Sequence, residues 1–361
     1  MFFYNYNSRN IKSAITAMLI LCKHPEGAQN SLPGEIIFSA LTSYYVQKKL
    51  FWRYKMTEYL PEGYLFTTTE NRSCIASFYS LSECMSTGKV LEAPCVICNS
   101  RHDLIVDLGC MRGIIPREEG AIGIVEGTTK DIALISRVNK PVSFIVTDFR
   151  RDEQGDLYAV LSRRAAQVKC MENYLSRLAP GDIIPARVTH LEPFGCFVDI
   201  GCGIPSLIPI DMISVSRITH PQDRFRVGQN IYAVVKSIDG GRICLTHKEL
   251  LGTWEENASL FEPGETVTGI VRSIEDYGIF VELTPNLAGL AELRQDVRVN
   301  SCASVYIKAI IPEKMKIKLI IVSTSDNAYC DNELKYFRTS GHIDSWVYSG
   351  DNQSKVIQTI F

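Results

Sequence analysis

Two aromatic pairs are the residues of this chain whose type and spacing best suit a binding chemistry. Phe194 and Phe197 enclose a glycine, and Tyr277 and Phe280 enclose another at the same spacing. An aromatic ring stacks on the flat face of a nucleobase, and that contact tolerates any base. Residues three apart on a regular strand face opposite sides, but a glycine-centred bend or bulge brings both rings to one face. We therefore expect two stacking surfaces. The alternative is that one ring of each pair belongs to a core.

Both pairs lie in a tandem repeat. Gly181 and Leu207 recur as Gly264 and Leu290, each 83 positions further along the chain. A fixed displacement of this kind is the signature of repeated structural units. The stacking surface is therefore expected to occur twice, on two copies of one scaffold.

A third, degenerate copy is expected upstream. Gly88 and Pro116 lie 93 positions before Gly181 and Pro209. This copy keeps some charge but no ring pair, so we expect little stacking on it. In place of the aromatics it has Arg101, His102 and Leu104.

The elements that position these residues read as short strands. Each copy holds about five runs rich in β-branched residues, separated by turn residues, within roughly 70 positions. That spacing predicts a small five-stranded closed barrel. Residues 164–179 and 248–262 have a helical composition and are each followed by Pro-Gly, so we expect short helical connectors there. The fold class is therefore mainly β, with tandem barrels joined by short helices.

Composition limits how the chain can attract an anionic ligand. The net charge is −2, so no global basic field is present, and binding must rest on local cations with stacking. Each cation has the alternative of an ordinary solvated charge. Those expected to contact phosphates are Arg187, Lys236, Arg242 and Lys248 in one copy, and Arg272, Lys308, Lys316 and Lys318 in the other.

The 12 cysteines raise the question of a metal site. Cys95 and Cys98 have zinc-like spacing, but no second such pair accompanies them, and on a strand they would face opposite sides. Scattered buried thiols are the preferred interpretation, and they suit a reducing cytoplasm. We expect no metal and no cofactor.

Several motifs together resemble the S1 RNA-binding domain, the OB-fold repeat of the bacterial ribosomal protein S1 family. They are Phe194–Ile200, Gly203–Leu207, Gly228–Asp239 and Arg242–Leu245. The whole chain resembles the short Gram-positive, clostridial-type homologues of that family. The resemblance implies tandem OB-fold barrels that bind single-stranded RNA, with mRNA and the small ribosomal subunit as partners. It also implies that the degenerate first copy contacts protein on the ribosome.

Two positions depart from the family pattern. The family usually has a histidine on the binding face shortly after the Gly-Leu motif, whereas this chain has Pro209 and Glu292 there. A carboxylate close to RNA phosphates is unfavourable, so the third copy is expected to bind less tightly than the second.

The expected organisation has eight segments. They are residues 1–55, an N-terminal extension outside the compact fold; 56–85, a lead-in; 86–163, a degenerate S1-like barrel; 164–179, a helical connector; 180–247, an S1 barrel; 248–262, a connector; 263–323, a shortened S1 barrel; and 324–361, a C-terminal tail.

Three functions are compatible with this organisation. The leading hypothesis is non-catalytic, cytoplasmic binding of single-stranded RNA at the small ribosomal subunit. The alternative is an RNA-binding regulatory or RNA-turnover adaptor that acts off the ribosome. An enzyme with accessory barrels is disfavoured, because the histidines are isolated and no segment is long enough for a catalytic domain. We expect neither a membrane nor a small-molecule substrate as a partner.

Overall fold

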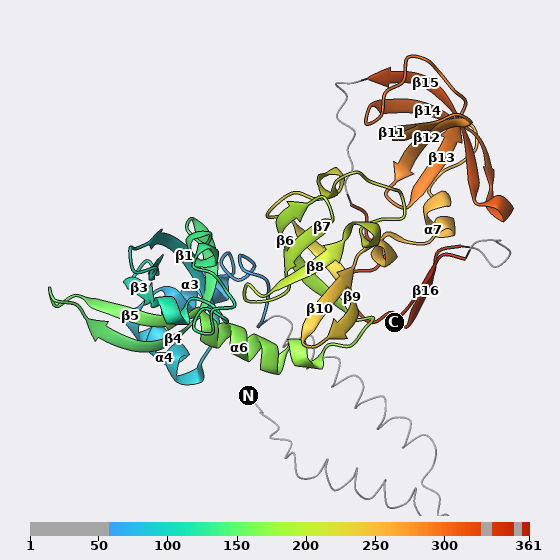
Figure 1. Cartoon of the computed structure of the whole chain (residues 1–361). Coiled ribbons are helices and arrows are strands. Elements are labelled where there is room, and N and C mark those ends of the chain that lie inside the picture. Colours follow the sequence, from blue (N-terminus) through green and yellow to red (C-terminus); the bar gives the residue numbers. More distant parts are fainter. Residues whose placement is uncertain (1–57, 326–333, 350–355) are drawn as a thin grey trace, which may run out of the picture. The chain divides into compact units, whose positions relative to one another are not determined.

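The computed structural model describes residues 58–325, 334–349 and 356–361 (Figure 1). Three closed five-stranded barrels follow one another in this part of the chain, which confirms the mainly β class with tandem barrels. The strand orders are β1-β2-β3-β5-β4, β10-β8-β7-β6-β9 and β11-β12-β13-β15-β14. We call them barrel 1, barrel 2 and barrel 3. The expected extension, residues 1–55, lies outside the described residues.

The strands have the following bounds. Barrel 1 consists of β1 (Leu91–Cys98), β2 (Leu104–Asp107), β3 (Arg112–Ile115), β4 (Lys140–Arg151) and β5 (Leu157–Ser162). Barrel 2 consists of β6 (Ile183–Glu192), β7 (Gly195–Asp199), β8 (Pro205–Pro209), β9 (Asn230–Asp239) and β10 (Arg242–Thr246). Barrel 3 consists of β11 (Thr266–Glu275), β12 (Gly278–Thr284), β13 (Leu287–Ala291), β14 (Cys302–Ile311) and β15 (Lys316–Ser325).

Helices precede and connect the barrels. They are α3 (Thr69–Ile75) and α4 (Phe78–Thr87) before barrel 1, α5 (Ile132–Ile135) inside it, α6 (Arg163–Asn173) with the 3-10 turn η2 (Leu175–Arg177) before barrel 2, and η5 (Lys248–Leu251) with α7 (Trp254–Ala258) before barrel 3. A two-stranded sheet of β16 (Ser345–Val347) and β17 (Gln358–Ile360) follows. No helix of the described residues is long and apolar enough to cross a membrane.

Strand alternation explains each core. In β7, Cys196 and Val198 are fully buried while Phe197 between them is not, as expected when successive side chains point to opposite faces. Each barrel closes through one parallel contact, in barrel 2 between Leu207 of β8 and Cys244 of β10. Closure leaves no unpaired strand edge.

Strand register shows that the repeat is structural. Cys196 pairs with Ile208 in barrel 2, and Ile279 pairs with Ala291 in barrel 3, so both partners shift by 83 positions. The connection between β13 and β14 in barrel 3 covers residues 292–301, whereas the one between β8 and β9 in barrel 2 covers residues 210–229. Barrel 3 is thus the smaller version of the same scaffold.

Barrel 1 corrects one detail of the sequence interpretation. Its β2–β3 turn is one residue shorter, because Asp107 pairs with Arg112 where Asp199 pairs with Pro205 in barrel 2. Leu104 therefore occupies a core position and is fully buried, so it does not replace an aromatic ring. The residue at the position of Phe197 is Ile105.

The lead-in before α3 joins barrel 1 to barrel 2. The Glu62 amide donates to Asp199 Oδ2 at 2.7 Å, and the Glu62 carboxylate accepts from Arg163 Nε at 2.6 Å and from Ser143 N at 3.1 Å. Burial raises the pKa of Asp199 to about 7, with the charge of Glu62 adding to the effect. Burial also raises the pKa of Glu92, beside the same segment, to about 8. The lead-in is therefore a structural part of the barrels.

A second buried ion network joins barrel 2 to barrel 3. Arg224, from the connection between β8 and β9, donates to Glu282 of β12, and both side chains are almost fully buried. Arg272 of β11 donates to the same carboxylate from Nε at 2.9 Å and from Nη2 at 3.1 Å. The guanidinium groups of both arginines are therefore bound to a buried carboxylate and stabilise the fold.

The C-terminal segment returns to barrel 2. The Ile343 amide donates to Gly181 O at 2.9 Å, and the Ile183 amide donates to Gly341 O at 3.0 Å. A Cβ atom on Gly181 would lie 2.3 Å from Ile343 O, so this position needs glycine. Beyond this contact, Trp346 is buried in the cluster that contains the core of barrel 3. These contacts give a physical role to residues 341–346, which read Gly-His-Ile-Asp-Ser-Trp.

We predict that Arg224→Ala lowers the free energy of unfolding by about 3 kcal/mol, because Glu282 loses one of two cationic partners inside a buried network. Arg217→Ala, at an exposed arginine of the same connection, is the control and should change it by about 0.5 kcal/mol or less. Urea unfolding followed by circular dichroism measures both. Equal losses in the two variants would contradict a structural role for the network.

Candidate nucleic-acid interface

The structure brings the two rings of each aromatic pair together. The ring centroids of Phe194 and Phe197 lie 5.9 Å apart at an interplanar angle of 89°. Tyr277 and Phe280 repeat this edge-to-face arrangement at 6.0 Å and 88°. Phe194 is 57% exposed and Tyr277 is 70% exposed. We call each ring pair a platform.

A close backbone approach explains the glycine in each platform. A Cβ atom on Gly195 would lie 2.6 Å from Ile208 O, and one on Gly278 would lie 2.7 Å from Ala291 O. Real Cβ contacts are not this short, so the neighbouring strand passes where a side chain would stand. Because β7 begins at Gly195, Phe194 sits in the preceding turn rather than on the strand. The opposite-face rule for a regular strand therefore does not apply to it.

Cross-strand register defines what lies beside each platform. The residue paired with Phe197 is Leu207, and the residue paired with Leu207 is Cys244. Register partners project from the same face of a sheet. The corresponding rows are Phe197–Leu207–Cys244 in barrel 2, Phe280–Leu290–Lys318 in barrel 3 and Ile105–Ile114–Val160 in barrel 1. Only the rows of barrels 2 and 3 contain a ring, and only that of barrel 3 contains a cation.

Two of the expected lysines occupy equivalent β-bulges. Lys236 is the unpaired residue between Val235 and Ser237 of β9. Lys308 is the unpaired residue of the bulge in β14, between residues that pair with Leu319 and Lys318. A bulge re-aims the side chain of its extra residue. The matching residue of barrel 1 is Thr147, so this cation is absent from its bulge.

The remaining cations on these faces stand at the start of the last strand. Arg242 begins β10 and Lys316 begins β15. Lys308, Lys316 and Lys318 are exposed. The face of barrel 3 thus presents three lysines, while that of barrel 2 presents Lys236 and Arg242.

Three expected cations belong to neither the platform rows nor the matching bulges. Arg187 donates to Asn230 Oδ1 at 3.3 Å and lies beside Gly63 of the lead-in. Arg272 is buried in its ion pair with Glu282. Lys248 belongs to η5, where its carbonyl accepts from the amide side chain of barrel 3 residue Asn286 at 2.8 Å. We therefore leave these three out of the interface proposed below.

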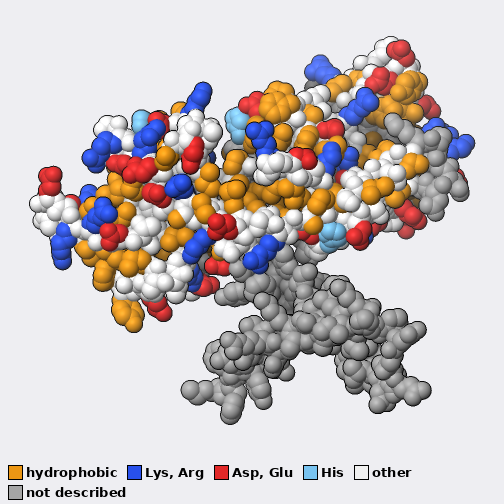
Figure 2. All heavy atoms as spheres, turned by 60° about the horizontal axis from the view of Figure 1, so that its bottom comes forward, with side chains coloured by type: hydrophobic (Ala, Val, Ile, Leu, Met, Phe, Trp, Pro, Cys, Tyr) orange, Lys and Arg blue, Asp and Glu red, His pale blue; other side chains and the backbone are white. Residues whose placement is uncertain are grey.

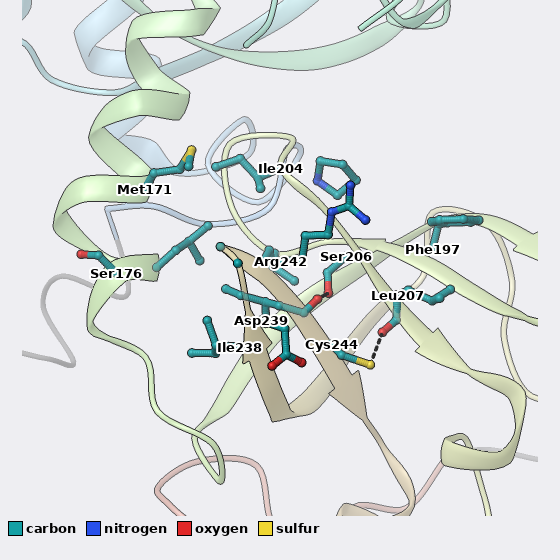
Figure 3. Close-up of a pocket in the computed structure, with 16 residues that line it drawn as sticks. Met171, Ser176, Phe197, Ile204, Ser206, Leu207, Ile238, Asp239, Arg242 and Cys244 are labelled. Carbon is teal, nitrogen blue, oxygen red and sulfur yellow. Dashed lines mark hydrogen bonds between the residues drawn. The ribbon is translucent and has the colours of Figure 1, made fainter. Parts of the chain in front are cut away.

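A pocket of about 1150 Å³ opens beside the platform of barrel 2 (Figure 3). Phe197, Leu207, Arg242 and Cys244 line it from the barrel, and Met171 and Leu175 line it from the connector. Sequence reasoning identified the helical connector but not its part in this pocket. The only sequence feature that could have indicated this role is the four-residue spacing of Met171 and Leu175, and such spacing is equally typical of core packing.

Charges on the molecular surface are mixed. Figure 2 shows Lys and Arg side chains interspersed with Asp and Glu on one face, with hydrophobic side chains gathered between them. This distribution accords with the net charge of −2. Attraction to a polyanion must therefore come from the few cations next to the platforms.

The cysteines of the described residues do not form a metal site. In the described part of the chain no group of three or more His, Cys, Asp or Glu residues could hold a metal ion. Cys95 is buried in β1, and burial raises its pKa to about 11. Cys302 is disulfide-bonded, so the expectation of free thiols throughout is wrong at that position.

With this geometry in view, comparison with known proteins defines the class. Residues 177–248 match the S1 RNA binding domain family, and this stretch coincides with barrel 2 and its entry. Barrel 3 repeats its register, so the chain has the fold of tandem five-stranded barrels, of which barrel 2 matches the S1 RNA binding domain.

Several named proteins are similar in sequence to this chain. The chain is 33% identical over 199 residues to the small ribosomal subunit protein bS1 homolog of Bacillus subtilis, covering 53% of this chain and 49% of that protein. It is 28% identical over 248 residues to small ribosomal subunit protein bS1 of Leuconostoc lactis, covering 66% and 54%. The bS1 protein of Staphylococcus aureus (strain COL) is 27% identical over 226 residues. The chain thus spans about half the length of these relatives, and the resemblance to Gram-positive S1 proteins is confirmed.

We predict that Phe194→Ala and Tyr277→Ala each lower the free energy of unfolding by less than about 1 kcal/mol, because both rings are largely exposed. Phe225→Ala is the control: that ring is 1% exposed, and its loss should cost about 3–5 kcal/mol. Chemical denaturation of the three variants provides the comparison. If either platform variant loses as much as the control, the ring is a core residue.

Proposed function

We propose that the chain binds single-stranded RNA through the platforms of barrels 2 and 3. The observation that carries this proposal is the doubled platform, with centroid distances of 5.9 Å and 6.0 Å and angles of 89° and 88°. An exposed ring and a half-buried ring held at a fixed angle suit unpaired bases, which are free to stack, better than a closed duplex. The S1 match of barrel 2 supports the same ligand.

The two platforms are proposed to contact different parts of a strand. In barrel 2 the row beside the ring ends in Cys244 and lies against a largely apolar pocket, which suits a base. In barrel 3 the row ends in Lys318, with Lys316 two residues earlier on the same strand, which suits backbone phosphates. Glu292, next to β13, opposes phosphate and weakens barrel 3. Barrel 1 has neither a ring nor a cation in its row or at its bulge and contributes least.

Each barrel alone is expected to bind weakly, because it offers two rings and a few cations. Tethering raises the overall affinity, since binding at one barrel places the next near the same strand. Salt lowers the affinity by displacing the phosphate contacts. No step of this function requires catalysis.

The site of action is proposed to be mRNA at the small ribosomal subunit in the cytoplasm. The similarity to proteins named small ribosomal subunit protein bS1 supports this location. An adaptor acting off the ribosome would use the same barrels. Co-sedimentation of the full chain with small subunits separates the two, because only the first requires the protein in the subunit fraction.

The test of RNA binding uses the full chain and a fluorescein-labelled 12-nucleotide oligouridylate. Phe197→Ala and Phe280→Ala should each weaken binding by about 1–3 kcal/mol, the worth of one base stack. Fluorescence anisotropy at constant salt gives the dissociation constants.

Phe78→Ala is the matched control, because Phe78 is an exposed ring of α4, outside either platform, with 47% exposure. It should bind like the unmodified chain. Should Phe197→Ala and Phe280→Ala both bind as tightly as Phe78→Ala, the platforms are not the binding surface and the proposed function fails.

A further inference from the structure

The pocket beside the platform of barrel 2 has one wall that does not belong to the barrel. Met171 on α6 and Leu175 on η2 line it opposite the strands. In Figure 3, Met171 lies on the helix side of the pocket and faces Ile204, while Phe197 marks the far end on the barrel. An isolated barrel 2 would lack this wall.

The connector is held in place by contacts one turn earlier. Gln167 Nε2 donates to Cys202 O at 3.2 Å, in the turn between β7 and β8, and Cys170 is fully buried. At the start of the helix, Arg163 is bound to Glu62 in the buried network. Residues four apart share one helix face, so Gln167 and Met171 lie on the side of α6 directed at barrel 2, and Leu175 of η2 continues the pocket lining. The wall is therefore positioned by the fold.

The chemistry of the pocket fits an unpaired nucleobase. Its volume of about 1150 Å³ exceeds the roughly 300–1,000 Å³ of small-ligand pockets, which leaves room for a nucleotide within a strand. The floor is apolar at Leu207, and Met171 offers a flexible thioether that makes favourable contacts with aromatic rings. Arg242, an exposed residue of the pocket lining, presents the planar donor set that suits phosphate.

We propose that this pocket is a second base subsite of barrel 2, continuous with the Phe194–Phe197 platform and closed on one side by Met171 of the connector helix. The inference rests on the proposed RNA-binding function and deepens it. A strand leaving Phe197 places its next base between Met171 and Leu207, with its phosphate at Arg242. Barrel 3 is preceded by the five-residue helix α7 and has Lys318 in place of Cys244, so the subsite is assigned to barrel 2.

The test compares two identical substitutions on one helix. Met171→Glu places a carboxylate in the subsite, whereas Val168→Glu places it one turn earlier, outside the pocket lining. The native side chains have similar exposure, 42% and 37%, so both variants should fold. Thermal melts verify this. Met171→Leu, which keeps the wall apolar, is the rescue variant.

With the labelled 12-nucleotide oligouridylate, Met171→Glu in the full chain should raise the dissociation constant about tenfold. Val168→Glu and Met171→Leu should stay within about twofold. Hydroxyl-radical footprinting of the unmodified chain should show that the oligonucleotide protects Met171 from oxidation.

Phe197→Ala, measured in parallel, separates two kinds of failure. Weak binding by Phe197→Ala with equal binding by Met171→Glu and Val168→Glu would overturn the subsite but leave the platform intact. Normal binding by Phe197→Ala would overturn the proposed function at barrel 2 and the subsite with it. Equal losses in both glutamate variants would show a general charge effect and no subsite.

Discussion

The close approach of two backbones at a glycine is the constraint on which the binding face depends. In barrel 2 the strand carrying Ile208 passes so near Gly195 that a Cβ atom would stand 2.6 Å from its carbonyl oxygen. This contact starts β7 at the glycine and leaves Phe194 in the turn, where its ring meets that of Phe197. Barrel 3 repeats the contact at Gly278, and its rings meet at the same angle. The platform is thus a consequence of backbone packing.

The charged residues divide into two populations with opposite roles. Arg163, Arg224 and Arg272 are buried against Glu62 and Glu282, where removal of one partner leaves a charge without compensation. These residues join one barrel to the next. Lys308 and Lys318 stand at a bulge and at a row end beside the platform of barrel 3 and are exposed. Lys236, at the matching bulge of barrel 2, is half-buried and donates to Met212 Sδ at 3.5 Å. A count of basic residues in the sequence does not distinguish these populations, because residue type alone does not show which cations are buried beside a carboxylate.

Much of the architecture was predictable from the sequence, and the reason is repetition. The shift of 83 positions located barrels 2 and 3, and the strand register reproduces it pair by pair. The same repeat identified the two aromatic ring pairs. The sequence did not predict features that depend on the length of a single turn or on contacts between separate segments. One residue fewer in the β2–β3 turn moved Leu104 into the core, and Arg272, expected to contact phosphate, is instead bound to the buried carboxylate of Glu282. Met171 was missed because only the packing of α6 against barrel 2 shows its place in the pocket.

The central claim is that the platforms of barrels 2 and 3, and not barrel 1, contact RNA. Ultraviolet crosslinking of the full chain to an oligonucleotide containing 4-thiouridine, followed by mass spectrometry of the crosslinked peptides, tests it most directly. The account predicts crosslinks in peptides that contain Phe194–Phe197 and Tyr277–Phe280, with few at Ile105 or Ile114. Crosslinks concentrated on barrel 1, or absent from both platform peptides, would contradict it.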